Sequence, residues 1–315
     1  MSIINSKKPT ATNSKPIKNK RLHIPKVRDH KSKVDQHRMK IGYFITARLK
    51  SSRLKQKILL PLHGATVLDH VINRCKQVNG IDDIVLCTST NPQDAKLYNY
   101  ALDHKIKFYA GSEDDVLKRL LDAAKYFGFD AFVSITADNP LHSIYVANLI
   151  VDWVTTKPAD FVFTSGLPIG LTPYFLNTKA LEIAVGMKEK TDSEIWGPFV
   201  NRPDFFKIGY LDLQTSLFDK DIRLTCDYID DYEVMVNIFS QFGEYYEPSI
   251  FEVSKLFREG KVLNTNGSIT QAAVPLNIIA DIKETFDQRK ERGMKIAEKI
   301  QHDLIPGENK LKIEL

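Results

Sequence analysis

The sequence predicts an α/β protein with a mainly parallel central sheet, and three observations lead to this prediction. From Ile41 onwards, short apolar runs alternate with helix-length segments, the arrangement of right-handed βαβ units in which helices cover both faces of a sheet. The chain has 315 residues and is 43% hydrophobic and 26% charged, which is enough for a large buried core. No apolar run approaches the roughly 18 to 20 residues that a membrane span needs.

The predicted elements are regular up to about residue 163. Ile41–Thr46 is apolar and ends in a polar, basic loop, as expected of a buried parallel strand followed by a loop at its carboxyl end. Further strands are predicted at Ile84–Cys87, Lys107–Tyr109, Ala131–Thr136 and Phe161–Phe163. Helices are predicted between them at residues 66–78, 93–104, 114–127 and 143–155.

Beyond Gly170 the pattern is less regular. It predicts helices at Lys179–Val185 and Asp230–Phe242 and strands at Phe206–Asp212 and Ile222–Thr225. The stretch Leu276–Gln301 spaces its apolar residues at helical intervals, which predicts a docking or dimerisation helix.

Charge is divided unevenly along the chain. Residues 1–40 hold 12 of the 44 Lys and Arg and two acids, a net charge of +10, whereas the whole chain carries +5. The remainder therefore carries −5. We expect residues 1–39 to form a basic, disordered tail, residues 40–262 the main domain and residues 263–315 a helical extension. A solvated tail is favoured over a nucleic-acid-binding arm, because no aromatic residue is interleaved with the charges and the body is acidic.

The three cysteines, Cys75, Cys87 and Cys226, are odd in number and widely separated. This spacing supports neither a disulfide framework nor a zinc site. We therefore expect core thiols in a protein of the reducing cytoplasm, without a membrane anchor.

The loop after the first strand is a candidate polyphosphate site. Ligands bind at the carboxyl ends of strands in open parallel sheets, and this loop, Ala47–Lys57, holds five cations together with Ser51 and Ser52. Charge-assisted donors are strongest against phosphate oxygens. The loop lacks the glycine patterns of P-loop and dinucleotide-binding proteins, and on charge alone a solvated basic loop is about as well supported.

Two acids, Asp138 and Asp227, end separate apolar runs. Mg²⁺ prefers a few carboxylates together with water and phosphate oxygens, so two aspartates from separate strand ends are suitable ligands. The alternatives are structural. Asn139 and Pro140 could simply start a helix, and the acids at 230 and 231 could cap the next one.

Five sequence blocks, in order along two thirds of the chain, resemble one enzyme family. They are Ala-Arg-x-x-Ser-Ser-Arg-Leu-x-x-Lys at 47–57, Leu-Pro-Leu-x-Gly-x-x-Val-Leu-x-His-Val-Ile-x-Arg at 60–74, Gly-Ser-Glu-Asp-Asp-Val-Leu-x-Arg at 111–119, Ile-Thr-Ala-Asp-Asn-Pro-Leu at 135–141 and Leu-Thr-x-Asp-x-x-x-Asp at 224–231. Together they resemble the cytidylyltransferases of the spore-coat polysaccharide biosynthesis type, which are relatives of the enzymes that make CMP-activated Kdo and sialic acids.

The resemblance implies a three-layer, nucleotide-diphospho-sugar transferase-like fold that uses CTP and Mg²⁺. It implies that Arg48, Arg53 and Lys57 contact the triphosphate, with Ser51 and Ser52 nearby, and that Asp138 and Asp227 hold the metal. The predicted catalytic residues are therefore Arg48, Lys57, Asp138 and Asp227. The Asp114–Leu117 part of the third block is expected to have structural roles, apart from helping to line the nucleotide pocket.

The sequence departs from the family pattern in two places. The first loop has Lys50, Lys55 and Gln56 where the family usually has Gly and then Pro-Gly. The histidine of the family's Glu-His-Val-Thr-Pro segment is replaced, because this chain reads Glu194-Ile-Trp196-Gly-Pro.

Gly170, Glu194 and Trp196 lie in the region where the resemblance places the acceptor, and they are predicted to bind substrate. Trp196 could form a platform for a sugar, although a buried packing role is the more common use of a lone Trp.

The predicted reaction transfers CMP from CTP to a sugar acid or related carbohydrate-type acceptor and releases pyrophosphate, in surface polysaccharide or glycoconjugate biosynthesis. A homodimer without specific nucleic acid is expected. One alternative is a glycosyltransferase of related fold, but Asp138-Asn139-Pro140 lacks the second acid of an Asp-x-Asp metal motif. The other is a nucleic-acid-binding protein that acts through the basic tail.

Overall fold

An eight-stranded sheet organises the chain in a computed structural model that describes residues 38–315, except 190–195, 215, 220 and 272–273. The strand order is β10-β9-β7-β8-β6-β1-β4-β5, and all neighbours are parallel except β8, which runs antiparallel to β6 and β7. The strands are β1 (Ile41–Thr46), β4 (Asp83–Ser89), β5 (Lys107–Gly111), β6 (Ala131–Thr136), β7 (Phe161–Ser165), β8 (Tyr174–Asn177), β9 (Lys207–Gln214) and β10 (Gly307–Glu314). Two short strands, β2 (Pro61–Leu62) and β3 (Ala65–Thr66), form a separate hairpin.

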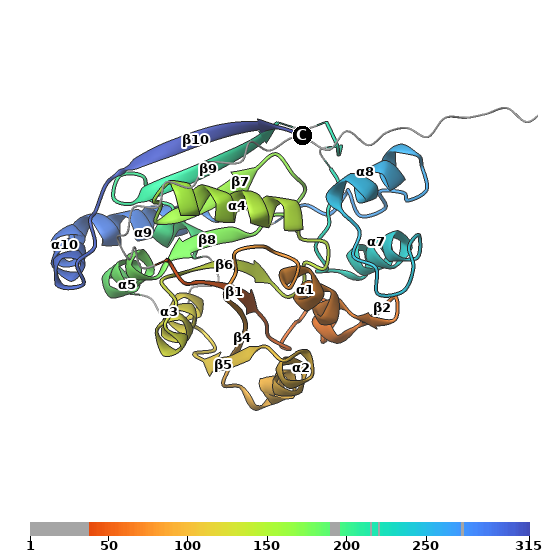
Figure 1. Cartoon of the computed structure of the whole chain (residues 1–315), viewed down its shortest axis with the longest axis horizontal. Coiled ribbons are helices and arrows are strands. Elements are labelled where there is room, and N and C mark those ends of the chain that lie inside the picture. The colour runs from red at the N-terminus through yellow and green to blue at the C-terminus, as the bar shows by residue number, and fades with distance from the viewer. Residues whose placement is uncertain (1–37, 190–195, 215, 220, 272–273) are drawn as a thin grey trace, which may run out of the picture. The chain divides into compact units, whose positions relative to one another are not determined.

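Helices cover both faces of the sheet and give three layers (Figure 1). One face packs against α1 (Val67–Cys75), α2 (Leu97–His104) and α4 (Ile144–Thr156). The other packs against α3 (Val116–Phe127), α5 (Thr178–Met187), α6 (Gly197–Val200), α9 (Leu276–Gln288) and α10 (Lys290–Lys299). A third apolar cluster holds α7 (Ile229–Phe239) and α8 (Ile250–Arg258) beside one end of the sheet.

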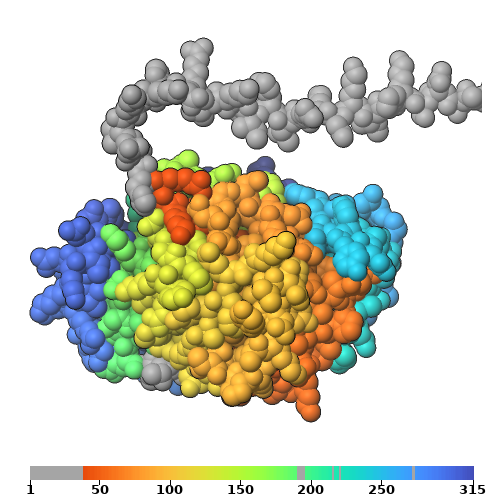
Figure 2. All heavy atoms as spheres, turned by 60° about the horizontal axis from the view of Figure 1, so that its bottom comes forward, coloured from red at the N-terminus to blue at the C-terminus, as the bar shows by residue number. Residues whose placement is uncertain are grey.

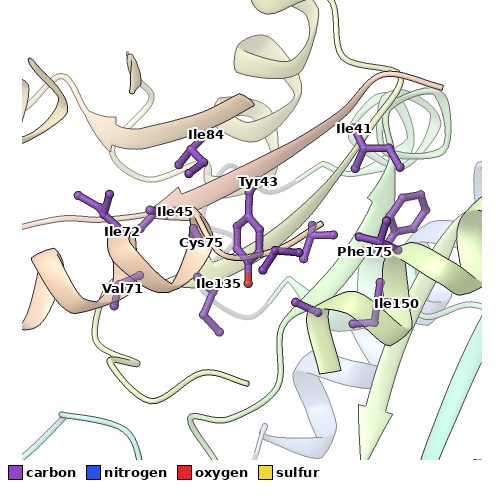
Figure 3. Packing of buried hydrophobic residues seen from close by; sticks show 14 of the residues in the cluster. Ile41, Tyr43, Ile45, Val71, Ile72, Cys75, Ile84, Ile135, Ile150 and Phe175 are labelled. Carbon is purple, nitrogen blue, oxygen red and sulfur yellow. The ribbon is translucent and has the colours of Figure 1, made fainter. Parts of the chain in front are cut away.

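Apolar side chains on alternate positions of the central strands form the core. Figure 3 shows one cluster, in which Tyr43 of β1 lies among Cys75 of α1 and Ile135 of β6. Tyr43 is fully buried, as are its strand neighbours Phe44 and Ile45. Because both faces of β1 are buried, its sequence is a nearly continuous apolar run, as is typical of parallel sheets covered by helices. The predicted α/β class and parallel sheet are confirmed.

Polar residues fix where the helices begin. Thr66 and Asp69 form a capping box at the start of α1, and Asp115 caps α3 by accepting a hydrogen bond from the Lys118 amide at 2.9 Å. Ser143 caps α4 in the same way. Such caps satisfy amide groups that have no partner within a helix.

Two predicted elements differ from the structure. Residues 222–225 form no strand, because their backbone pairs with loops: the Leu224 amide donates to the Ile169 carbonyl at 2.9 Å. The stretch predicted as one helix over 276–301 is two helices, α9 and α10, which meet at Arg289.

The segment 263–315, expected as a helical extension, also contains β10, which pairs with β9 at the edge of the main sheet. Figure 2 shows this C-terminal part beside α5. Of the predicted tail, residues 1–37 lie outside the described part of the chain, and Met39 packs against the core. Within the described residues, every helix is too short or too polar to cross a bilayer.

Candidate active site

A cavity of about 500 Å³ opens at the carboxyl ends of β1 and β6. Its walls come from the basic loop that follows β1, the turn after β6 and the loop between β5 and α3, with contributions from Trp196 and Asp227. Eight of the ten residues predicted for the site line it: Arg48, Ser51, Ser52, Arg53, Lys57, Asp138, Trp196 and Asp227. We expected ligand-binding side chains at the carboxyl ends of the parallel strands, and these eight residues lie there.

Backbone hydrogen bonds hold the start of the basic loop, and at its end the Gln56 carbonyl accepts from the Leu59 amide at 2.8 Å. The Ala47 amide donates to the Cys87 carbonyl at 2.9 Å, and the Leu49 amide donates to the buried carboxylate of Asp94 at 2.7 Å. Asp94 is itself held by the Ser89 hydroxyl. The cations that follow are mostly exposed, since the side chains of Lys50 and Arg53 are 67% and 47% exposed.

Lys57 is the exception in this loop, because it is largely buried between two carboxylates. Its Nζ lies 2.5 Å from Asp138 Oδ2 and 2.6 Å from Asp227 Oδ1. Burial on its own would lower the pKa of Lys57, but the hydrogen bonds and charges of the two aspartates outweigh it and raise the pKa above its usual value. Both predicted acids therefore converge on one point in the cavity.

Asp138 is fixed by the turn that follows β6. Its Oδ1 accepts a hydrogen bond from the Thr136 hydroxyl at 2.5 Å, and its carbonyl accepts from the Cys226 amide at 2.8 Å. The second contact ties the turn to the segment that carries Asp227. The next helix begins only at Ile144, so the alternative that Asn139 caps it is wrong.

Asp227 belongs to a buried polar network. Its Oδ2 lies 3.2 Å from Arg223 NH2, and Arg223 also contacts Asp231 at 3.1 Å. Asp231, fully buried, accepts the amides of Asp227 and Tyr228 at 3.0 Å and the side-chain amide of Asn266 at 2.8 Å. Burial favours the neutral form of the Asp227 carboxyl, but Lys57, Arg53 and Arg223 outweigh it and lower its pKa.

Asp231 therefore caps the start of α7, which is the structural role considered above for this residue. Through the Asp227 amide and Arg223 it also orients Asp227. Asp230 is exposed in the first turn of the same helix. Arg53 completes the cluster, with NH2 3.1 Å from Asp227 Oδ1 and its guanidinium over the Tyr228 ring.

The residues predicted for the acceptor region are only partly at the cavity. Trp196 is half-buried, lines the cavity and packs against Tyr174, with ring centroids 4.4 Å apart. Glu194 lies outside the described residues. Gly170 is buried behind the wall, where its φ of +96° and a backbone approach to Leu224 leave no room for a Cβ.

Among the cavity residues that were not predicted as site residues are three charged ones, Glu113, Asp114 and Arg119, from the loop between β5 and α3 or the first turn of α3. For Asp114 the resemblance had implied only that its block helps to line the nucleotide pocket. Glu113 accepts hydrogen bonds from Lys50 Nζ at 3.1 Å and Asn91 Nδ2 at 3.0 Å. The third sequence block contains all three residues, but only their position at the end of β5 brings them to the cavity. Arg223 and Asn266 were missed because nothing in the sequence indicates that they are buried.

The pair Asp138 and Asp227 fits a divalent cation that shares its coordination with a ligand. Within the described residues, no group of three or more His, Cys, Asp or Glu side chains converges. A cation held here would therefore take two carboxylates from the protein and its remaining ligands from phosphate and water, which is how Mg²⁺ commonly binds in nucleotide sites.

Comparisons with known proteins agree with this geometry. A family model described as Cytidylyltransferase matches residues 43–266. An uncharacterised protein of Methanocaldococcus jannaschii is 32% identical over 235 residues, which cover 74% of this chain and 97% of that protein. The spore coat polysaccharide biosynthesis protein SpsF of Bacillus subtilis is 23% identical, with coverage of 69% of this chain and 93% of its own length.

Among solved structures, a cytidylyltransferase from Leptospira borgpetersenii superposes with a TM-score of 0.67 and 26% identity, covering 74% of this chain and all of that one. A CMP:2-keto-3-deoxy-manno-octonic acid synthetase complexed with CTP gives a TM-score of 0.50 with 13% identity, over 64% of this chain and 99% of its own. The second likeness shows the fold alone.

Proposed function

This chain belongs to the cytidylyltransferase family and is a nucleotidyltransferase, and from that premise we propose that it transfers the cytidylyl group of CTP to a sugar acid or related carbohydrate acceptor. The observation that carries the proposal is the meeting of Lys57, Asp138 and Asp227 in a cavity walled by the basic loop. Two similarities support a role in surface polysaccharide or glycoconjugate formation: one to SpsF of Bacillus subtilis, and one to a 3-deoxy-manno-octulosonate cytidylyltransferase of Aeromonas salmonicida, which is 24% identical over 163 residues. The family match favours this reading over a glycosyltransferase.

In the proposed reaction the oxygen of an acceptor hydroxyl attacks the α-phosphorus and its proton passes to water. A P–O bond forms there, and the bond to the leaving pyrophosphate breaks. Catalysis of such a step depends mainly on positioning and on neutralising charge. Arg48, Arg53 and Lys57 supply positive charge along the cavity wall, where they would bind the triphosphate and balance the charge that grows on pyrophosphate.

Asp138 and Asp227 are the residues that would hold Mg²⁺, which supplies charge neutralisation at the phosphates and lowers the pKa of a bound hydroxyl. The protein prepares them for this before any ligand binds. Thr136 fixes Asp138, the Arg223 network fixes Asp227, and Lys57 balances their charges. Ser51 and Ser52 add hydroxyl donors at the cavity, and Trp196 offers an aromatic surface to the acceptor.

The proposal includes a cellular setting. A cytoplasmic location suits an enzyme that uses CTP and has three buried free thiols. A homodimer is proposed because apolar side chains of the C-terminal helices remain exposed, among them Leu276 and Met294. No specific nucleic acid is proposed as a partner.

The test is pyrophosphate release from CTP and Mg²⁺ across a panel of sugar acids. We expect Asp138→Asn to lower turnover at least about a thousandfold and to leave the melting temperature close to that of the unaltered protein, because the amide keeps the side chain's shape. The matched control is Asp230→Asn, which removes an exposed acid from the first turn of α7. Undiminished activity of Asp138→Asn would remove the proposed role of this carboxylate.

A further inference from the structure

The helices α9 and α10 lie outside residues 43–266, which the family model matches. They nevertheless pack against the part of the chain that reaches the cavity. α10 packs on α5, and α9 packs on α6 (Figure 1). These are the two helices that precede and follow Trp196 in the chain. The C-terminal helices therefore contact the elements that bring Trp196 to the cavity wall.

The short helix α6 cannot hold its own position. It has only four residues, of which one is Gly197 and the next is a proline. A single helical turn does not form stably by itself, so packing must fix it. Trp196 is the residue that caps this helix, and its carbonyl accepts the Phe199 amide at 2.9 Å. The position of Trp196 at the cavity therefore depends on whatever holds α6.

α9 holds α6 through an aromatic ring and an ion pair. Phe199 of α6 is buried and packs against Phe286 of α9, with ring centroids 6.1 Å apart. Arg202, which follows α6, lies with its guanidinium over the same ring, 4.8 Å from the centroid. Its NH2 is 3.3 Å from Asp287 and 2.8 Å from Asp204. A guanidinium that both stacks and pairs has a defined orientation, so Arg202 locks α6 onto α9.

α10 holds the end of α5 in a similar way. Gly293 of α10 faces Met187, the last residue of α5, and a Cβ at Gly293 would collide with the Met187 sulfur. The two helices therefore approach more closely than a larger residue would allow. Arg289, where α9 and α10 meet, forms an ion pair with Glu189, two residues beyond the end of α5. One pair of helices thus contacts the chain on both sides of Trp196.

The strand order indicates which ligand Trp196 faces. Trp196 packs on Tyr174 of β8 and Phe161 of β7, at ring-centroid distances of 4.4 and 6.2 Å. The order β7-β8-β6-β1 puts these strands on one side of β6 and the basic loop, which follows β1, on the other. Asp138 follows β6, between the two sides. If the triphosphate lies along the basic loop, the side of the cavity at Trp196 is left for the acceptor.

We propose that Arg202 is a positioning residue for acceptor binding. Together with Phe286 it fixes α6 on α9 and so holds Trp196 at the acceptor side of the cavity. Arg202 does not itself line the cavity, so it acts only through Trp196. The proposal rests on the proposed function, because it takes this side of the cavity as the acceptor site. It makes α9 a support of that site.

The first test follows Trp196 by fluorescence and needs no ligand. The chain has two tryptophans, so Trp153→Phe leaves Trp196 as the only one. In this background Arg202→Met and Phe286→Leu should increase the quenching of Trp196 emission by acrylamide, because both changes loosen α6. The matched control is Phe129→Leu. It alters a buried phenylalanine of the same apolar cluster, two residues before β6 begins and hence at the opposite end of the sheet, and should leave the quenching unchanged.

The second test compares KM values in the chain with both tryptophans. It uses CTP, Mg²⁺ and the member of the sugar-acid panel that reacts fastest with the unaltered protein. In Arg202→Met and Phe286→Leu the KM for the sugar acid should rise about tenfold, whereas the KM for CTP should stay within about twofold. A loss of folded protein alone lowers the apparent kcat and changes neither KM, which is the result expected for Phe129→Leu.

Several outcomes would overturn the inference. They are unchanged quenching in both variants, quenching that rises as much in Phe129→Leu, an unchanged KM for the sugar acid, and an equal rise of both KM values. Phe286→Leu decides alone if Arg202→Met fails to fold. If the unaltered protein converts no sugar acid of the panel, the proposed function fails, whereas the quenching comparison still decides whether Arg202 positions Trp196.

Discussion

The two segments that meet at the cavity carry opposite charges and are held in opposite ways. The basic loop, Ala47–Lys57, is anchored at its start and presents mostly exposed cations. In the acidic segment, Arg223–Asp231, the carboxylates of Asp227 and Asp231 are buried and are matched by Arg223, Asn266 and backbone amides. Two cations of the loop, Arg53 and Lys57, contact Asp227 of the acidic segment, and of the two only Lys57 is largely buried.

This difference suggests that the two segments have different roles: one binds the ligand, and the other holds the reacting site in a fixed geometry. Water and dissolved ions screen the charges of exposed cations, so these side chains are not held in one geometry. They can therefore change position as a triphosphate binds. Buried carboxylates that are fully hydrogen-bonded keep one geometry before any ligand arrives. Under the proposed function, the loop would capture the polyanion, and the network would fix the point at which the reaction occurs.

Replacing the residue that joins the two segments should have the largest effect. Lys57→Met removes the positive charge between Asp138 and Asp227, so we expect pyrophosphate release to fall about a thousandfold. The control is Lys55→Met, which alters an exposed lysine of the same loop that does not line the cavity and should keep activity within threefold or so. Normal turnover of Lys57→Met would mean that the ammonium only balances the charge of the two carboxylates.

Breaking the buried network should act on stability first. In Arg223→Met two carboxylates lose their buried partner, and we expect the free energy of unfolding to fall by about 3 kcal/mol at pH 7. The same substitution at Arg119, which has no acidic partner, should cost less. Chemical denaturation of both variants measures the contrast, and equal losses would contradict the division between the two segments.

The cost of Arg223→Met should also depend on pH. The folded Asp227 carboxyl has a lowered pKa, so its stabilising contribution is present above the ordinary carboxyl pKa of about 3.9 and is lost as pH falls through the folded value. We therefore expect the full cost at neutral pH and a shrinking cost towards about pH 2. If the loss in free energy of unfolding caused by Arg223→Met does not change with pH, the loss comes from packing and not from the ion pair.

The two segments also differ in how far their sequence predicts them. The order of strands and helices up to Phe163 follows from periodicity, because both faces of the central strands β1, β4 and β6 are buried and the helices between the strands have an apolar face. The convergence of Asp138 and Asp227 followed from their positions after apolar runs together with the family resemblance. Ile222–Thr225, at the start of the acidic segment, was predicted as a strand, because a short run with apolar residues looks the same in sequence whether its amides bond to a strand or to a loop.

Long-range partners could not be predicted. Asn266 lies 43 residues from Arg223, whose carbonyl it contacts, and no local pattern marks that contact. β10 is rich in charged residues and almost entirely exposed, so it lacks the apolar signal of a strand and was read as part of a helical extension. Arg119 was not predicted as a site residue, because only the structure shows that it lines the cavity.

The smallest effect is expected at the tip of the basic loop. Gln56 has a left-handed backbone with φ of 49°, at a position where the resembling family usually has Gly. Left-handed conformation costs a residue with a Cβ about 1 kcal/mol, so Gln56→Gly should raise the free energy of unfolding by up to about that amount. Lys105, the exposed residue that ends α2 with φ of 56°, offers the control, because Lys105→Gly meets the same backbone requirement far from the basic loop.

Activity then separates the two glycine variants. If the loop captures its ligand by adapting to it, Gln56→Gly should change the KM for CTP by no more than about twofold, as Lys105→Gly should. Alternatively, the left-handed backbone of Gln56 holds the next residue, Lys57, in position to contact the two carboxylates. In that case the added backbone freedom of Gly should raise KM or lower kcat in Gln56→Gly but not in Lys105→Gly. A loss confined to Gln56→Gly would show that the loop is as rigidly prepared as the acidic segment it faces, which would contradict the division of roles between them.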